Sequence, residues 1–274
     1  MLRIAANIST MFTERPLVER IKAAADAGFA AVECQFPYEV PAAEMKAALD
    51  DACMPIVLIN TPPGDFDAGE RGLAALPGRE ADFRAAIDQA LTYASAIGCN
   101  KIHVMAGVQP DGTMREDCLQ LFEQNLRHAT SLIQDKATPM LLIEPINTRD
   151  IPGYVLNTPE QAAAIIERLG QPCLRLQYDF YHTQIMRGDV AKGLEVFWSI
   201  IGHIQFAGVP ERQEPDIGEL NCDYLLECLD RLGYDGWIGA EYFPAGNTED
   251  GLGWAVRYGI MPKPTNLATG GELV

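Results

Sequence analysis

The sequence predicts an α/β fold in the form of one (β/α)₈ barrel, in which eight parallel strands alternate with helices. Eight apolar runs of strand length recur along the chain, near residues 3–7, 30–33, 56–59, 101–105, 139–144, 173–178, 202–206 and 236–240. Longer segments with helical periodicity separate these runs. The chain has 274 residues, of which 48% are hydrophobic, enough to fill one large core. We therefore expect a single domain over residues 1–258.

Two of the intervening segments indicate where helices begin and end. Apolar residues recur on one face of Pro16–Ala27 and of Arg79–Ile97, and Gly28 and Gly98 follow directly. A glycine just past the last turn is a common helix C-cap, because it readily adopts a left-handed conformation. An open doubly wound sheet would instead need a glycine-rich phosphate loop after the first strand. Residues Asn7–Met11 (NISTM) do not form such a loop, which favours the barrel.

Two segments are longer than ordinary connections. Residues 61–79 interrupt the third β/α unit, and residues 209–220 follow the seventh strand. Long loops at the carboxyl ends of barrel strands often form walls or lids of a site, although 209–220 can also be read as a solvated polar loop. The last residues, 259–274, contain two prolines and a glycine pair. They predict an extended or disordered tail that could pack on a neighbouring subunit.

Charge and hydropathy exclude several classes of partner. Lysine and arginine number 21 against 38 acidic residues, so the formal net charge is −17. Nucleic acid and anionic membranes are therefore not expected partners. No apolar stretch approaches the length of a membrane span, and the N-terminus begins like a strand rather than a signal peptide. We expect a cytoplasmic protein.

The cysteines indicate neither disulfides nor a zinc site. There are seven of them, an odd number, and no pair has the C-x-x-C spacing of a metal knuckle. We expect them to be reduced and mostly buried, because free cysteine behaves as a small core residue.

Four of the predicted strands end in a residue that can bind a metal ion: Glu144, Asp179, Gln205 and Glu241. These residues lie about 35, 26 and 36 positions apart, close to the length of one β/α unit. A closed barrel would bring all four to one mouth. Each acid alone could simply cap a helix or pair with an arginine. Three carboxylates together without a cation would cost several kcal/mol, and this all-oxygen set suits Mg²⁺ or Mn²⁺.

Other polar residues near the same mouth are candidates for binding substrate. His182 lies one helical turn beyond Asp179, where it could donate a hydrogen bond to a substrate oxygen. Arg212 follows Gln205 and is the nearest guanidinium that could pair with a carboxylate. Further polar residues fall at predicted strand ends, where they could contact substrate or only secure loops: Asn7, Asn60, His103 and Glu33. His203 lies inside a strand and His128 in a helical stretch, so we expect structural roles for both.

Short motifs spread along the chain resemble the hydroxypyruvate isomerase family, within the xylose-isomerase-like TIM barrels. The resemblance extends to about residue 255. It rests on the segments FTE (12–14), FPY (36–38), GERG (69–72), LPGRE (76–80), LIEPIN (142–147), DIPG (150–153), QYDFYH (177–182), HIQ (203–205), EP and GE (214–215, 218–219), GWIG (236–239) and EY (241–242).

This resemblance implies that Glu144, Asp179, Gln205 and Glu241 hold a divalent cation, with Glu144 and Glu241 as the proton-handling pair. The implied reaction converts hydroxypyruvate to 2-hydroxy-3-oxopropanoate (tartronate semialdehyde) through an ene-diolate, with His182 and Arg212 holding the substrate. Related ketose epimerases usually carry histidine where Gln205 stands, so this chain departs from the wider pattern at one ligand.

Several alternatives remain open at this point. A 2-oxo-tetronate isomerase or a ketose 3-epimerase would use the same four ligands and differ in pocket length and in where the proton returns. A nuclease of the related abasic-site type would need metal-binding histidines and a basic groove, and this chain has four histidines and a charge of −17. A non-enzymatic metal-binding protein is a further alternative. The expected partners are a small 2-oxo or hydroxy acid and copies of this chain, as a dimer or tetramer.

Overall fold

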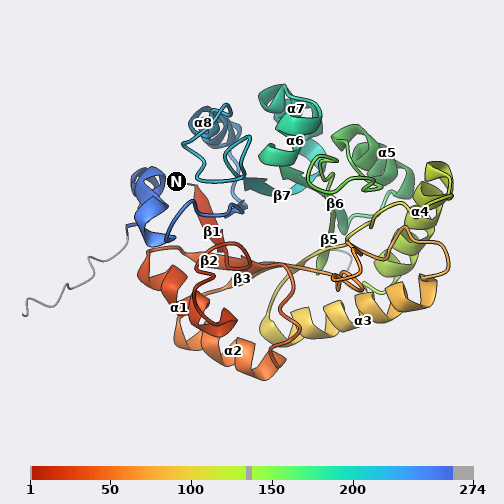
Figure 1. Cartoon of the computed structure of the whole chain (residues 1–274), viewed down its shortest axis with the longest axis horizontal. Helices are drawn as coiled ribbons and strands as arrows, with labels where there is room; N and C mark the ends of the chain where they lie inside the picture. Colours follow the sequence, from red (N-terminus) through yellow and green to blue (C-terminus); the bar gives the residue numbers. More distant parts are fainter. Residues whose placement is uncertain (1, 134–137, 262–274) are drawn as a thin grey trace, which may run out of the picture.

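A computed structural model describes residues 2–133 and 138–261, and in these residues the chain forms a closed barrel of eight parallel strands surrounded by helices (Figure 1). The strands follow one another around the barrel in sequence order. The first strand pairs with both the second and the eighth, which closes the barrel. The predicted (β/α)₈ fold is confirmed.

The strands are β1 Arg3–Asn7, β2 Ala31–Cys34, β3 Ile56–Asn60, β4 Lys101–His103, β5 Met140–Ile143, β6 Leu174–Asp179, β7 Ile201–Phe206 and β8 Trp237–Ala240. The α-helices are α1 Leu17–Asp26, α2 Ala42–Asp51, α3 Glu80–Ile97, α4 Arg115–Ser131, α5 Pro159–Leu169, α6 Phe180–Met186, α7 Val190–Phe197 and α8 Cys222–Leu232. Two 3₁₀ segments, η1 Trp198–Ile200 and η2 Glu249–Tyr258, complete the elements. Segment η2 takes the place of a helix after β8.

The β4 strand is two residues shorter than predicted. The apolar run 101–105 continues past His103, but the backbone beyond it turns away from the sheet and bonds to the long segment 61–79. The Met105 amide donates to the Thr61 hydroxyl at 3.2 Å, and the Ala106 carbonyl accepts from Ala75 at 2.8 Å. This segment is therefore attached to the mouth of the barrel next to β4.

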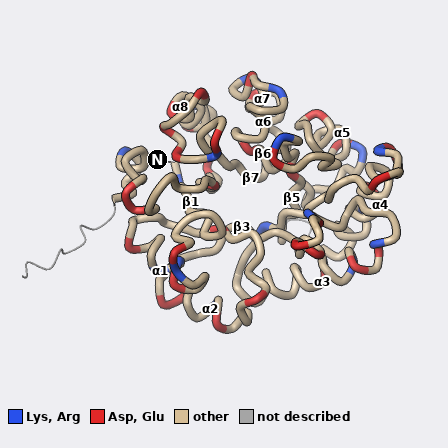
Figure 2. Tube along the Cα trace, in the orientation of Figure 1, with Lys and Arg blue, Asp and Glu red and all other residues tan. Residues whose placement is uncertain are grey.

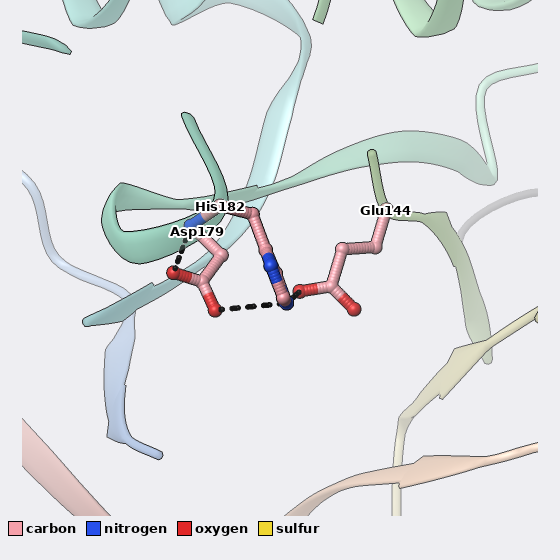
Figure 3. A group of neighbouring side chains, drawn as sticks. All are labelled: Glu144, Asp179 and His182. Atoms are coloured by element: carbon pink, nitrogen blue, oxygen red, sulfur yellow. Dashed lines mark hydrogen bonds and ion pairs between the residues drawn. The ribbon is translucent and has the colours of Figure 1, made fainter. Parts of the chain in front are cut away.

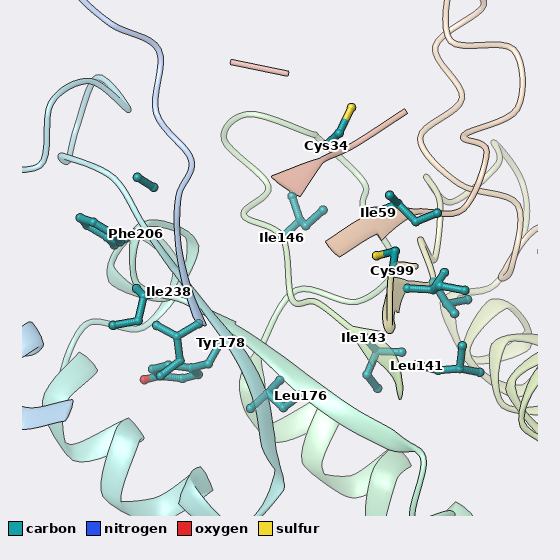
Figure 4. Close-up of a cluster of buried hydrophobic side chains, with 14 of the residues drawn as sticks. Cys34, Ile59, Cys99, Leu141, Ile143, Ile146, Leu176, Tyr178, Phe206 and Ile238 are labelled. Carbon is teal, nitrogen blue, oxygen red and sulfur yellow. The ribbon is translucent and has the colours of Figure 1, made fainter. Parts of the chain in front are cut away.

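The two faces of the strands differ in polarity. In β7, Ile204 and Phe206 belong to the apolar core between barrel and helices, whose side chains Figure 4 shows. The alternate residues, His203 and Gln205, point into the barrel, where both contact Glu33 of β2. Side chains alternate along a strand, so in β7 a period of two separates the apolar outer face from a polar inner face. Barrel interiors are normally filled by apolar side chains, which makes this polar interior a feature to explain.

Helices α1 and α3 end as their glycines predict. Gly98 is the left-handed C-cap of α3, with φ of 75°. Gly28 follows α1 with φ of 96°, and a Cβ there would lie 3.2 Å from the backbone nitrogen of Met261. The first residues of the predicted tail thus pack against the end of α1. Residues 262–274 lie outside the described part of the chain.

All seven cysteines are free, and six of them are buried, with only Cys53 exposed. This agrees with the expectation of reduced core residues. Acidic positions occur all around the ring of helices in Figure 2, consistent with the net charge of −17. Within residues 2–133 and 138–261, no helix has both the length and the apolar character that a membrane crossing requires.

Candidate active site

Three acidic residues stand at the carboxyl ends of strands β5, β6 and β8, at one mouth of the barrel. Glu144 follows β5, Asp179 ends β6 and Glu241 follows β8, and each is at most 5% exposed. Ligand atoms of Glu144, Asp179 and His182 all lie within 4.8 Å of one another (Figure 3). Among the described residues, Glu241 is not part of that tight group. The structure therefore brings two of the predicted ligands together with a histidine that the sequence suggested for substrate binding.

Asp179 divides its two carboxylate oxygens between two environments. Its Oδ1 caps helix α6 by accepting from the backbone nitrogens of Tyr181 at 2.6 Å and His182 at 3.3 Å. Its Oδ2 is buried and has no hydrogen-bond partner within the described chain. Burial raises the pKa of Asp179 to about 7, against the lowering effect of the Arg212 charge. One oxygen thus serves the helix, and the other is available to a ligand.

Glu144 is the least satisfied carboxylate of the site. Its Oε1 has no hydrogen-bond partner in the part of the chain described, and its Oε2 lies 3.4 Å from Nδ1 of His103. Neither ring nitrogen of His103 has a hydrogen bond there either. Burial raises the pKa of Glu144 far above its usual range, and the charges of Glu241 and Asp179 add to the rise. Burial also lowers the pKa of His103 to about 3, so that its ring is neutral.

Glu241, in contrast, is held by three donors. Its Oε1 accepts from Gln35 at 2.8 Å and from Arg212 at 2.6 Å, and its Oε2 accepts from Nε2 of Gln205. Burial raises the pKa of Glu241 to about 6, while the Arg212 charge acts in the opposite direction. The two glutamates therefore differ: Glu241 is fixed in orientation, whereas Glu144 has an oxygen free to gain a partner.

Gln205 bridges the site and the barrel interior. Its Nε2 donates to Glu241 and also, at 2.6 Å, to Oε1 of Glu33. Its Oε1 accepts from Nε2 of Gln177 at 2.6 Å. A nitrogen between two carboxylates identifies the NH₂ end of the amide. The carbonyl oxygen keeps one lone pair, the one that a cation would require.

A charged layer fills the barrel beneath Gln205. Glu33 is fully buried and accepts from Asn7 at 3.1 Å and from Gln205, and its Oε2 lies 2.8 Å from Nε2 of His203. Nζ of Lys101 lies 3.3 Å from the other nitrogen of that ring. Burial raises the pKa of Glu33 to about 7 and lowers that of Lys101 to about 8. This chain of contacts connects β4, β7 and β2 and supports Gln205 from below.

Asn7 and Asn60 lie at the ends of β1 and β3, where the sequence suggested substrate contacts. The side chain of Asn7 is occupied by Glu33 and by the backbone nitrogen of Ser9, at 3.0 Å from its Oδ1. Asn60 is 6% exposed, and its Nδ2 has a weak contact with the Met105 sulfur at 3.9 Å. Asn7 therefore supports the charged layer, whereas the Asn60 amide retains hydrogen-bonding capacity.

The close approach of Glu33 to β8 gives a stability prediction. A Cβ added at Gly239 would lie 2.3 Å from Oε1 of Glu33. We expect Gly239→Ala to lower the free energy of unfolding by about 1–3 kcal/mol, the usual cost of overpacking, as measured by urea denaturation. Gly246→Ala is the matched control, because nothing lies within 4 Å of a Cβ there. Equal unfolding midpoints for the two variants would show that Glu33 can move aside freely.

Arg212 reaches into the site from the 209–220 segment. Its backbone has φ of 55°, in the left-handed region, and its side chain is 15% exposed. The guanidinium lies over the rings of Tyr181 and Phe243, 5.1 and 5.9 Å from their centres. Its Nη2 donates to Glu241, whereas its buried Nε has no partner among the residues described. The segment after β7 thus contributes the cationic side chain of the site.

Three amide side chains that contact this site were not predicted from the sequence: Gln35, Asn147 and Gln177. Gln177 lies two residues before Asp179 on β6, and Gln35 two residues after Glu33, so a period of two could have placed both. Asn147 lies in the loop after β5, where no periodicity applies. Its contacts depend on the conformation of that loop.

Comparison with known proteins agrees with the fold. The family model described as xylose isomerase-like TIM barrel matches residues 21–258. The chain is 53% identical to the 2-oxo-tetronate isomerase of Cupriavidus necator, covering 94% of this chain and 99% of that protein. It is 42% identical to the hydroxypyruvate isomerase of Escherichia coli, covering 94% and 100%.

A solved structure described as AP endonuclease, family 2, from Brucella melitensis shares 44% identity with a TM-score of 0.91. It covers 94% of this chain and 99% of its own. The match of the family model and the high identity to full-length relatives show that the chain belongs to the xylose isomerase-like TIM barrel family.

Proposed function

We propose that the protein is a divalent-metal-dependent isomerase that interconverts hydroxypyruvate and 2-hydroxy-3-oxopropanoate. The observation that carries this proposal is the contrast between Glu144 and Glu241, two buried carboxylates at one mouth with different partners. Two carboxyl groups in unlike environments suit the removal and return of a proton. Isomerases with such substrates in their names are close relatives of this chain.

The donor set of the site fits a hard divalent cation. Two buried oxygens, Oε1 of Glu144 and Oδ2 of Asp179, lack partners in the described chain, and burial raises the pKa of both groups. We assign the cation to Glu144, Asp179, Glu241 and the carbonyl of Gln205, and Mg²⁺ or Mn²⁺ suits these oxygen ligands. When bound, such an ion polarises the substrate carbonyl and makes the adjacent C–H more acidic.

The residues of the chain then move protons between two carbons. One of the two glutamates removes a proton from C3 of hydroxypyruvate, which leaves an ene-diolate, and returning a proton to C2 gives the aldehyde product. The hydroxyl proton of O3 ends on O2, so the atoms balance. We assign His182 and Arg212 to hold substrate oxygens during this transfer, and the short distances from His182 to Arg212 and Glu144 support this assignment. His103 and Asn60 have the hydrogen-bonding capacity to position the remaining polar groups.

Arg212 is the group we assign to the substrate carboxylate. Its Nε, which has no partner among the residues that the structure describes, and its position beside Glu241 support this role. We expect Arg212→Ala to raise KM by about one to two orders of magnitude, because a charge-assisted pair contributes about 1.5–3 kcal/mol. Steady-state kinetics with hydroxypyruvate measures this change. A neutral hydroxyketone without the carboxylate should be affected far less.

Arg149→Ala is the matched control for Arg212, since Arg149 is an exposed guanidinium that contacts Tyr181 and the Pro210 carbonyl from the neighbouring loop. Its KM should stay near that of the unmodified protein. If Arg212→Ala raises KM equally for hydroxypyruvate and for the neutral hydroxyketone, the arginine shapes the loop instead of binding the carboxylate.

A second candidate is 2-oxo-tetronate isomerisation, favoured by the 53% identity to an enzyme of that name. Both reactions would use the same proton transfer and differ by the length of the substrate. Initial rates of the metal-loaded protein with hydroxypyruvate and with 2-oxo-tetronate, followed by NMR, test the two. If the protein converts neither substrate, the proposed function is contradicted.

The net charge of the chain is consistent with a small-molecule substrate, and three further predictions from the sequence remain to be tested. A net charge of −17 disfavours nucleic acid as a substrate, unlike the substrate that the name of the Brucella structure implies for that protein. Assembly as a dimer or tetramer, a location in the cytoplasm and a separate tail after residue 258 stay predictions.

A further inference from the structure

We infer that Asn147 is a positioning residue that fixes His182 as the tautomer with its proton on Nε2, so that this ring donates to a substrate oxygen and does not bind the metal. The inference rests on the proposed function for the role of that oxygen. The tautomer itself follows from hydrogen bonds around the two side chains. The position of His182 in the cluster shown in Figure 3 alone allows two roles for its ring, as a metal ligand or as a hydrogen-bond donor to the substrate. The tautomer decides between these two roles.

The orientation of the Asn147 amide is determined by its neighbours. Its Oδ1 accepts from the backbone nitrogens of Arg149 at 3.0 Å and Asp150 at 2.8 Å. Its Nδ2 lies 3.1 Å from Oδ2 of Asp150, an acceptor when ionised. A flipped amide would place NH₂ against two backbone donors, which is unfavourable. The NH₂ end of Asn147 therefore faces away from these backbone nitrogens.

This NH₂ group meets the ring of His182. Nδ2 of Asn147 lies 2.7 Å from Nδ1 of His182, and the backbone nitrogen of Asn147 lies 3.3 Å from the same atom. Both groups can only donate, so Nδ1 accepts and carries no proton. A neutral imidazole has one ring proton, which must then be on Nε2. Burial, and the charge of Arg212 after it, lower the pKa of His182 well below the usual range, consistent with a neutral ring.

The proton on Nε2 points to a space bordered by unsatisfied groups. Nε2 lies 3.8 Å from Oδ2 of Asp179 and 3.9 Å from Oε1 of Glu144. Nη2 of Arg212 lies 3.4 Å from Nε2 and would donate to it if that nitrogen were unprotonated, but the two donors on Nδ1, the nearer at 2.7 Å, outweigh this single longer contact. The carboxylate oxygens are too far away for good hydrogen bonds. Two donors, from His182 and Arg212, therefore lie beside one another, and a single substrate oxygen between them could accept from both.

The same tautomer excludes His182 as a ligand. An imidazole nitrogen binds a metal through the lone pair that its proton would occupy, and a protonated Nε2 has none available. The other nitrogen is turned toward Asn147. His182 thus complements a cation held by the carboxylates without competing for it. Asn147 lies three residues after Glu144, so one loop carries both the proposed ligand and the residue that orients the donor.

The direct test is ¹⁵N NMR of the histidine side chains. The chain has only four histidines, and long-range ¹H–¹⁵N correlation spectra distinguish a protonated ring nitrogen from an unprotonated one. The signals of His182 are identified as those that disappear from the spectrum of the His182→Gln variant. We expect His182 of the unmodified protein to show a protonated Nε2, both without metal and with saturating Mg²⁺. A protonated Nδ1, or loss of the Nε2 proton on adding Mg²⁺, would overturn the inference.

Asn147→Asp tests the cause of this tautomer. The aspartate keeps an oxygen for the backbone nitrogens of Arg149 and Asp150, but it presents an acceptor to the ring in place of a donor. We expect Nδ1 of His182 to become protonated and kcat/KM to fall about tenfold or more. Mg²⁺ affinity, measured by isothermal titration calorimetry, should change less than threefold. An unchanged ring in the folded variant would contradict the role of Asn147.

Tyr181→Phe is the matched control. Tyr181 bonds to Arg149 and Asp150 of the same loop, but its hydroxyl does not contact the ring nitrogens of His182. We expect the spectrum of His182 to keep its Nε2 proton in this variant. If Tyr181→Phe also moves the proton, general loosening of the loop explains the tautomer, and the specific role of Asn147 is refuted. Because the NMR measurements need no turnover, their failure is distinct from failure of the proposed reaction.

Discussion

Removal of divalent ions with EDTA is expected to abolish isomerisation, and Mg²⁺ or Mn²⁺ is expected to restore it. The physical reason is the group of acids at the barrel mouth, where Glu144 and Asp179 each keep one buried oxygen without a partner in the described part of the chain. Carboxylates so close together and removed from water repel one another unless a cation compensates them. The substrate C–H is also too weak an acid to release its proton readily without a cation beside the carbonyl.

Rates before and after EDTA treatment, with residual metal verified by elemental analysis, measure this dependence. Calorimetry adds a measurement that does not require turnover. Asp179→Asn should weaken Mg²⁺ binding at least tenfold, because it removes a charge while its amide oxygen can still cap α6. Asp88→Asn, an exposed site on α3, serves as the matched control. Full activity in protein free of divalent metal would refute a metal-dependent mechanism.

Much of the fold could be predicted because its signals are local and repeated. The apolar runs give seven strands to within one residue at each end, and their even spacing predicts a closed barrel. The end of β4 could not be predicted from the sequence, since Met105 and Ala106 are apolar and leave the sheet only because segment 61–79 bonds to their backbone. That contact joins parts of the chain whose pairing no local pattern encodes.

The candidate site could be predicted in part for a similar reason. Strand ends of a barrel share one mouth, so the positions of Glu144, Asp179 and Glu241 followed from the spacing alone. The directions of the side chains could not be derived from that spacing. The sequence suggested a substrate contact for Asn7, yet its amide bonds to Glu33, and His203 proves to be part of a charged layer inside the barrel. Such partners depend on strands β1, β2 and β7 meeting across the interior, which only the folded chain provides.

The role of the two glutamates leads to the last prediction. Glu144→Gln and Glu241→Gln should each lower the exchange of substrate C–H protons by a factor of roughly 10² or more, the usual scale for removal of a general acid or base. An amide has nearly the shape of a carboxyl group but cannot accept the proton. Exchange in D₂O, followed by NMR, measures this step directly, and circular dichroism checks the fold. Glu160→Gln, at an exposed site on α5, is the matched control.

The two variants should differ in stability, which gives an independent check on the different environments of the glutamates. Glu241 accepts from three donors, and an amide in its place would direct an NH₂ group at one of them, so Glu241→Gln should lower the melting temperature. Glu144 has a buried oxygen with no partner among residues 2–133 and 138–261. Replacing this costly buried charge by a neutral amide should leave the melting temperature of the metal-free protein equal or higher. Near-normal proton exchange in either variant would show that the base lies elsewhere. Equal loss of stability in both would show that Glu144 is as well bonded as Glu241, which would remove the asymmetry on which the proposed proton transfer depends.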